Sequence, residues 1–216
     1  MLISAKASGD GQEAQSLGYY ERNAKSYFKA TRDADLSALY ERFLRRLPKG
    51  ARILDAGSGS GRDTLAFVRR GYAVSAFDSS AALCELSTRL TGVRTRLLRF
   101  QELEVEGEYD GIWACASLLH VSEAELPNAI GRLIRALKPD GVLYMSFKHG
   151  ADERVTEDGR SFTDMTESGL RRVLRRVPGV KLEELWITAG EGQFQGQGEW
   201  LNALVTKHKR GGSRDD

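Results

Sequence analysis

A glycine-rich turn is the segment of this sequence whose residue types and spacing bear most directly on chemistry. Gly57, Gly59 and Gly61 alternate with small residues after Asp55, between an apolar run and an expected helix. Glycine permits positive φ angles and lets a ligand approach the backbone without meeting a Cβ atom. The first turn of the helix would direct free N–H groups at such a ligand. The pattern predicts a ligand-binding turn.

The acidic residues near this turn indicate which ligand it binds. A dinucleotide turn has the spacing G-x-G-x-x-G, whereas the spacing here is D-x-G-x-G-x-G. The carboxylate of Asp55 would repel a diphosphate and attract a ligand with ammonium and sulfonium groups. Asp78 ends the next apolar strand, where acidic residues bind ribose hydroxyls. We therefore expect S-adenosylmethionine (SAM) rather than NAD.

The elements that must position these residues alternate along the chain. Strands are expected at residues 52–56, 73–78, 93–100, 109–116, 141–148, 180–188 and 200–207. Helices are expected between them at 62–70, 81–90, 123–137 and 167–176, and helical patterns also cover residues 16–47. Several strands are continuous apolar runs, which are typical of a parallel sheet covered on both faces. The sequence predicts a doubly wound α/β fold.

The last two strands have no helix between them. The intervening residues 190–199 are rich in Gly and Gln, which predicts a hairpin with one antiparallel strand. Residues 150–164 are expected to form a long irregular loop, in which Arg160 and Phe162 are candidates for a wall of the substrate pocket. We expect one domain at residues 16–207, flanked by flexible residues 1–15 and 208–216.

Composition sets limits on location and partners. The chain has 216 residues, a net charge of +2 and two cysteines, Cys84 and Cys115, without metal-ligand spacing. It lacks a transmembrane run and the apolar core of a signal peptide. We expect a cytoplasmic protein with reduced cysteines, no metal, no membrane contact, no nucleic-acid partner and a monomeric or homodimeric state.

These residues together resemble the class I SAM-dependent methyltransferases, from Tyr19 to Lys207. Besides the glycine turn and Asp78, residues 109–120 and 137–143 are similar to the fourth strand of that family and to the turn into its fifth. The resemblance implies a seven-stranded Rossmann-like sheet of order 3-2-1-4-5-7-6 with strand 7 antiparallel.

A narrower resemblance is to the small bacterial tellurite-resistance-like methyltransferases, through residues 113–120, 146–148 and 200–202. Members of that group expected to act on oxyanions carry arginines before the last strand. Residues 190–199 contain none here, which argues against an oxyanion acceptor.

The resemblance also implies a site. The helical segment 16–48 would form a lid whose aromatic side chains, from Tyr19, Tyr20, Tyr27 and Phe28, exclude water. The expected cofactor-binding residues are Asp55, Gly57, Gly59, Gly61, Asp78, Ser79, Phe100, Gln101, Ala116, Tyr19 and Tyr27. Phe100 and Gln101 would hold adenine.

Two residues are catalytic candidates because they follow strands at the carboxyl edge, where open α/β sheets bind ligands. His120 is either a general base or a packing residue of its loop. Lys148 either faces an anionic substrate or is a solvated strand end. Methyl transfer mainly requires orientation and desolvation, so no catalytic triad is expected.

The sequence thus predicts a methyltransferase that acts on a small molecule. The alternatives are a nucleic-acid or protein methyltransferase, a SAM-binding protein without catalysis, and a dinucleotide-dependent oxidoreductase. A nucleic-acid enzyme would need a basic face or an Asn/Asp-Pro-Pro-Tyr/Phe motif after the fourth strand. That loop reads Ala-Ser-Leu-Leu-His.

Overall fold

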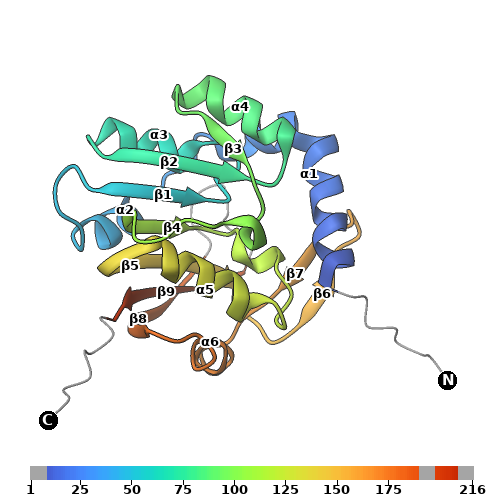
Figure 1. The fold of residues 1–216 in the computed structure, drawn as a ribbon. Coiled ribbons are helices and arrows are strands. Elements are labelled where there is room, and N and C mark those ends of the chain that lie inside the picture. The colour runs from blue at the N-terminus through green and yellow to red at the C-terminus, as the bar shows by residue number, and fades with distance from the viewer. Residues whose placement is uncertain (1–8, 190–197, 209–216) are drawn as a thin grey trace, which may run out of the picture.

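A twisted sheet forms the centre of the protein (Figure 1). The structure is a computed structural model that describes residues 9–189 and 198–208. The strands of the sheet are β1 (Arg52–Ala56), β2 (Ala73–Asp78), β3 (Thr95–Leu97), β4 (Tyr109–Ala114), β5 (Leu137–Lys148), β8 (Val180–Ala189) and β9 (Glu199–Lys207). Their order is β3-β2-β1-β4-β5-β9-β8, and β9 pairs antiparallel with both β5 and β8. The predicted fold and strand order are confirmed.

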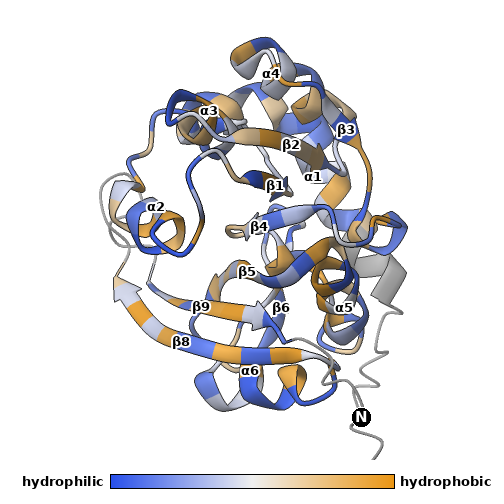
Figure 2. Ribbon diagram, turned by 60° about the vertical axis from the view of Figure 1, so that its left-hand side comes forward, coloured by the Kyte–Doolittle hydropathy of each residue, from blue (hydrophilic) through white to orange (hydrophobic). Residues whose placement is uncertain are grey.

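Helices cover both faces of this sheet, with α2 and α5 on opposite sides in Figure 2. The helices are α1 (Gly9–Thr31), α2 (Ser37–Leu44), α3 (Arg62–Arg69), α4 (Ala81–Thr91), α5 (Leu126–Ala136) and α6 (Glu167–Leu174). Single 3-10 turns form at Phe100–Glu102 (η1) and Leu118–His120 (η2). Every helix in the described part of the chain is too short or too polar to span a lipid bilayer.

Each face of the sheet has its own apolar core. On one face, Ile130 and Leu133 of α5 pack with Leu143 of β5. On the other, Phe43 of α2 packs against Trp113 of β4, with ring centroids 5.2 Å apart. The continuous apolar run of β5 is explained by this arrangement, because its side chains are buried on both faces.

The first helix starts earlier than we predicted. Residues 1–15 were expected to be flexible, but α1 already begins at Gly9. It lies across the carboxyl edge of the sheet in Figure 1, and Ser16 of α1 accepts a hydrogen bond from the backbone N–H of Ser161 at 2.8 Å. A helix that crosses an edge does not need the continuous apolar stripe by which a helix that packs on a sheet is recognised.

Other boundaries differ for local reasons. The segment 150–164, expected to be irregular, contains the hairpin β6 (Glu153–Val155) and β7 (Ser161–Thr163). Strand β3 is shorter than expected because the chain turns into η1, where the Glu102 carboxylate accepts from the Arg99 N–H. Helix α5 begins three residues late, since a proline at its second position favours a helix start there. The C-terminal residues 209–216 and most of 190–199 lie outside the described residues.

The packing of α2 on β4 yields a test of stability. A Cβ atom at Gly111 of β4 would lie 2.7 Å from side-chain atoms of Leu47 and Phe43, whereas Gly131 of α5 has open space. We expect Gly111→Ala to destabilise the fold by about 1–3 kcal/mol through overpacking. Gly131→Ala, the matched control, should stabilise it by about 0.5–1 kcal/mol. Urea unfolding of both variants checks this, and equal midpoints would contradict the packing described.

Candidate active site

The turn between β1 and α3 requires its glycines. Gly57, Gly59 and Gly61 have φ angles of 79°, 53° and 80°, a region that side chains disfavour. A Cβ atom at Gly57 would lie 2.5 Å from the Cβ atom of Ser117. A Cβ atom at Gly61 would lie 2.5 Å from the Ser87 hydroxyl oxygen of α4. The first two glycines border a cavity, while Gly61 allows α3 and α4 to pack closely.

Asp55 lines neither of the two cavities described below. Its carboxylate is buried and accepts a hydrogen bond of 2.6 Å from the Thr64 hydroxyl in α3. Burial and the charge of the nearby Asp63 raise the pKa of Asp55 to about 8. Neither its position nor its charge therefore supports our argument that this carboxylate attracts an ammonium group.

Of the two acidic residues that flank the glycine turn, Asp63, in the first turn of α3, is the one that lines a cavity. It accepts two hydrogen bonds from Arg62, at 2.6 and 2.9 Å, one from the Tyr40 hydroxyl at 2.5 Å and one from the Trp113 indole at 2.8 Å. Burial opposes its charge, but Arg62 and these donors hold the pKa of Asp63 below its ordinary value. This network joins the glycine turn to α2 and β4.

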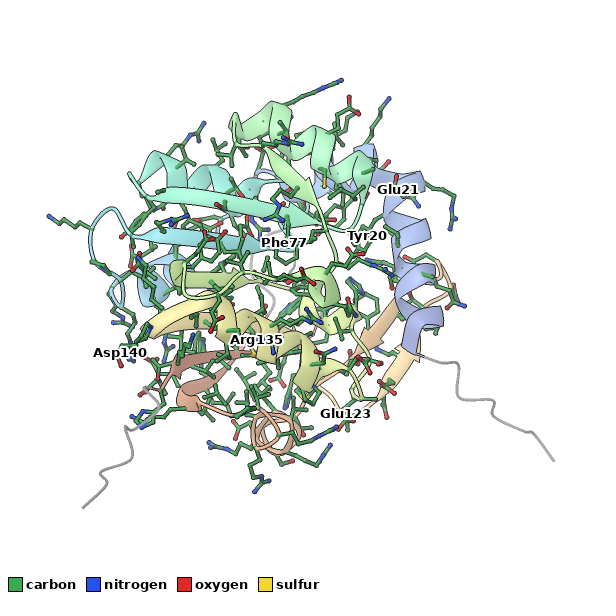
Figure 3. All side chains as sticks on the ribbon, viewed as in Figure 1. Tyr20, Glu21, Phe77, Glu123, Arg135 and Asp140 are labelled. Atoms are coloured by element: carbon green, nitrogen blue, oxygen red, sulfur yellow. The ribbon has the colours of Figure 1, made fainter. Side chains whose placement is uncertain are left out.

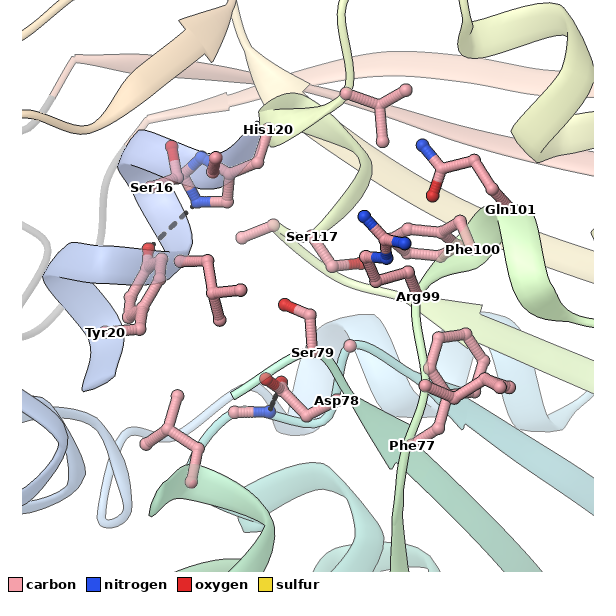
Figure 4. A pocket seen from close by; sticks show the side chains of 18 of the residues that line it. Ser16, Tyr20, Phe77, Asp78, Ser79, Arg99, Phe100, Gln101, Ser117 and His120 are labelled. Atoms are coloured by element: carbon pink, nitrogen blue, oxygen red, sulfur yellow. Dashed lines mark hydrogen bonds between the residues drawn. The ribbon is translucent and has the colours of Figure 1, made fainter. Parts of the chain in front are cut away.

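A first cavity of about 150 Å³ lies between the ends of β2 and β4 and the helix α1 (Figure 4). Asp78 and Ser79 lie on one side of it, and Phe100 and Gln101 on another. Asp78 accepts hydrogen bonds from the backbone N–H groups of Gly59 at 2.8 Å and Ser80 at 2.9 Å. Asp78 thereby holds the glycine turn against the second strand. The backbone N–H of Ser79 also donates to this carboxylate, which retains acceptor capacity for a hydroxyl donor.

A second cavity of about 490 Å³ continues from the first toward β5, β9 and the β6–β7 hairpin. The residues that line both cavities are Tyr20, Tyr27, Gly57, Gly59, Ala116 and His120. Ala116 holds a left-handed conformation with φ of 51°, and its N–H donates to the Ser146 hydroxyl at 2.9 Å. Such strain in a non-glycine residue is found preferentially at functional sites.

Helix α1 closes the site from outside. Tyr20 projects from it toward the sheet in Figure 3, and its hydroxyl lies 2.9 Å from Nε2 of His120. The ring of Tyr27 lies 3.3 Å from the position of a Cβ atom on Gly59. Tyr19 lines neither cavity, and its ring instead lies 4.6 Å from the Arg160 guanidinium. Of the three tyrosines expected in the lid, Tyr20 and Tyr27 line both cavities.

The hydrogen bonds of His120 define its protonation. Nδ1 lies 2.7 Å from the carbonyl oxygen of Ser161, which can only accept, so Nδ1 carries the proton. Nε2 is then the acceptor for the Tyr20 hydroxyl. Burial and, to a smaller extent, the charge of Arg160 lower the pKa of His120 to about 4, although its hydrogen bond to Ser161 opposes the shift. His120 is a neutral residue that fixes α1, and its basic nitrogen is already occupied.

Lys148, the other catalytic candidate, ends β5 and lines the second cavity. Its ammonium nitrogen lies 4.1 Å from the centroid of the Trp200 ring. Burial and the nearby charge of Arg154 lower its pKa. Arg160 and Phe162 also line this cavity, as the sequence predicted for one of its walls.

Sequence reasoning missed several residues of the site. Asp63 follows the glycine turn directly, but nothing in the sequence shows that an acidic residue of a helix is buried. Ser117 supports the turn by donating to the Ala56 carbonyl at 2.7 Å, and Arg154 belongs to a hairpin that we did not expect. Within the described residues, no cluster of three or more His, Cys, Asp or Glu side chains is arranged for a metal ion.

The state of His120 can be measured directly. We expect its imidazole to remain the neutral Nδ1–H tautomer at pH 6, because its pKa of about 4 keeps it unprotonated well below the range of a solvated histidine. Nitrogen-15 NMR of the ring, assigned by loss of the signal in His120→Gln, checks both points. A doubly protonated ring at pH 6 would contradict the assignment.

Comparison with known proteins agrees with this architecture. Residues 28–190 match the family model described as "Methyltransferase domain". No curated protein sequence matches the chain significantly. Among solved structures, a Burkholderia thailandensis 1,6-didemethyltoxoflavin N1-methyltransferase superposes with a TM-score of 0.79 at 22% identity, over 96% of this chain and 93% of that one.

Two further structures resemble the chain. A TehB-like SAM-dependent methyltransferase from Corynebacterium glutamicum has a TM-score of 0.64 at 22% identity, over 90% of this chain and 98% of that one. Magnesium protoporphyrin IX methyltransferase from Synechocystis has a TM-score of 0.68 at 14% identity, over 94% and 100%. The family match covers most of the described chain, from within α1 to the end of β8. The chain belongs to the methyltransferase-domain family, which confirms its resemblance to the class I SAM-dependent methyltransferases.

Proposed function

We propose that this methyltransferase transfers the methyl group of SAM to a small-molecule acceptor. The observation that carries the proposal is the meeting of two cavities at Tyr20, Ala116 and His120. The first cavity has the residues that a nucleoside requires, and the second is large enough for a separate organic molecule. Methyl transfer requires two such ligands that meet at one point.

The residues of the first cavity fit the nucleoside of SAM. Asp78 would accept hydrogen bonds from ribose hydroxyls, and Phe100 and Gln101 would border the adenine. Phe77 and Phe100 already form an edge-to-face pair, with ring centroids 5.4 Å apart. The pair gives this part of the cavity an apolar surface suited to a flat base.

The glycine turn fits the amino-acid end of the same molecule. Gly57 and Gly59 present backbone without side chains to the cavities, and Ser58 lines the second. The Ser58 hydroxyl is buried and has no hydrogen-bond partner among the described residues. Because buried polar groups are nearly always paired, a bound polar ligand would satisfy it.

When bound, SAM supplies an electrophilic methyl group with a good leaving group. The chain's own residues then orient the acceptor and exclude water. Tyr20 and Tyr27 of α1 form the outer wall where the two cavities join. The Tyr20–His120 hydrogen bond holds that wall in place, so we assign His120 a positioning role and propose that α1 acts as the lid of the site.

Related structures support a small acceptor. The Burkholderia enzyme was crystallised with 1,6-didemethyltoxoflavin and S-adenosylhomocysteine, and the Synechocystis enzyme with SAM. The proposed enzyme would be cytoplasmic and a monomer or homodimer, and would not require nucleic acid.

Calorimetry with the purified protein tests the proposal. SAM and S-adenosylhomocysteine should bind, and NAD should not. A screen for transfer of labelled methyl groups to small molecules then identifies acceptors. Binding of NAD in place of both nucleosides would overturn the assignment, and SAM binding without transfer in any screen would favour a non-catalytic SAM-binding protein.

A single substitution tests the nucleoside site. We expect Asp78→Asn to weaken SAM binding by about 1.5–3 kcal/mol, the range for hydrogen bonds to a charged group. Glu85→Gln is the matched control, since it removes an equal charge from an exposed position on α4. Calorimetric titration of both variants measures the effect. Unchanged affinity in Asp78→Asn would show that this carboxylate does not bind the ribose.

A further inference from the structure

We propose that the acceptor is an organic anion with a flat apolar body, and that Lys148, Arg154 and Arg160 bind its negative group. This inference rests on the proposed function and specifies its substrate class. It follows from the distribution of charges and rings in the second cavity.

Three cations from neighbouring segments face this cavity. Lys148 ends β5, Arg154 lies in β6, and Arg160 precedes β7. Arg154 and Arg160 lie close together, since both guanidiniums stand over the ring of Phe162. Burial and the charge of Arg154 lower the pKa of Lys148, an effect that Asp164 opposes and Arg160 adds to. Three cations held together in a partly buried space favour a bound anion.

The carboxylates that pair with these arginines do not line the cavity. Asp164 accepts from Arg154 at 2.7 Å, and Asp158 accepts from Arg160 at 2.7 Å. The wall thus carries three positive and two negative charges, with the positive ones on the inner side. Of the remaining lining charges, Asp63 is paired with Arg62, while Asp35 is a single negative charge at the exposed start of α2, where solvent screens it.

Aromatic rings hold the cations in position. The guanidiniums of Arg154 and Arg160 lie 4.8 and 5.3 Å from the centroid of the Phe162 ring, and Lys148 stands over Trp200. Cation–π contacts of this kind restrict long side chains that would otherwise be mobile. Phe162, Trp200 and Tyr144 also give the cavity a surface for a flat apolar molecule.

The chemistry of methyl transfer is compatible with an anionic acceptor. The basic nitrogen of His120 accepts from Tyr20, and Arg160 opposes protonation of the ring. An acceptor that arrives as an anion needs no base. Its lone pair forms a bond to the methyl carbon while the carbon–sulfur bond breaks with its electron pair left on sulfur. The products are the neutral methylated acceptor and S-adenosylhomocysteine, and no proton is released.

Matched pairs of aromatic probes test the inference. Benzoate with benzamide, nicotinate with nicotinamide, and 2-naphthoate with 2-naphthamide are titrated into protein saturated with S-adenosylhomocysteine. We expect the carboxylates to bind at least about tenfold more tightly than the amides, because a charge-assisted hydrogen bond is worth a factor of that order or more. The same pairs compete with any acceptor found in the methyl-transfer screen.

Variants assign the effect to two of the three cations, Lys148 and Arg154. Lys148→Gln and Arg154→Gln should each weaken carboxylate binding on the order of tenfold, with amide binding and S-adenosylhomocysteine affinity unchanged. Arg171→Gln, on the exposed face of α6, is the control for loss of one positive charge. The inference is wrong if S-adenosylhomocysteine binds but the carboxylates bind no more tightly than the amides, or if the variants leave carboxylate affinity unchanged. The proposed function stands in either case. If S-adenosylhomocysteine itself does not bind, the proposed function fails.

Discussion

The hydrogen bond from Tyr20 to His120 is the interaction on which the site depends. It exists because the Ser161 carbonyl fixes the proton of His120 on Nδ1 and leaves Nε2 to accept. Three segments far apart in sequence, α1, η2 and β7, are thereby joined at the point where the cavities meet. His120 is the only histidine that lines either cavity among the described residues. Because its Nε2 accepts from Tyr20, the arrangement that closes the site also occupies the nitrogen that could take up a proton.

A second buried network sets the position of the cofactor turn. Asp63 accepts hydrogen bonds from Arg62, Tyr40 and Trp113, which connect α2, α3 and β4 next to the glycines. Removing one donor would leave a buried charge incompletely satisfied, which costs more than the lost bond itself. Tyr40 and Trp113 also belong to the apolar core on that face, so the turn is supported by packing and by charge together.

Local patterns were enough to predict the sheet and part of the site. The sheet could be predicted from short segments: continuous apolar strands, alternating helices and the missing helix before β9. The first cavity is lined, as expected from their positions at or after strand ends, by Gly57, Gly59, Asp78 and Phe100. The direction of a side chain is not a local property. Asp55 and Asp63 are equally acidic and flank the same turn, and only the packing of α2 and α3 decides which one faces the ligand space.

The proposed anion site gives the cations a second role. If the acceptor reacts as an anion, its ionisation sets the fraction that can react, because the protonated acid is a much poorer nucleophile. Nearby positive charges favour the ionised form and lower the pKa of a bound acid. Lys148, Arg154 and Arg160 would therefore both hold the acceptor and increase the fraction of it that is nucleophilic. An alcohol of high pKa gains too little from this to react, so a positively charged wall beside a neutral histidine selects acceptors by acidity as well as by shape.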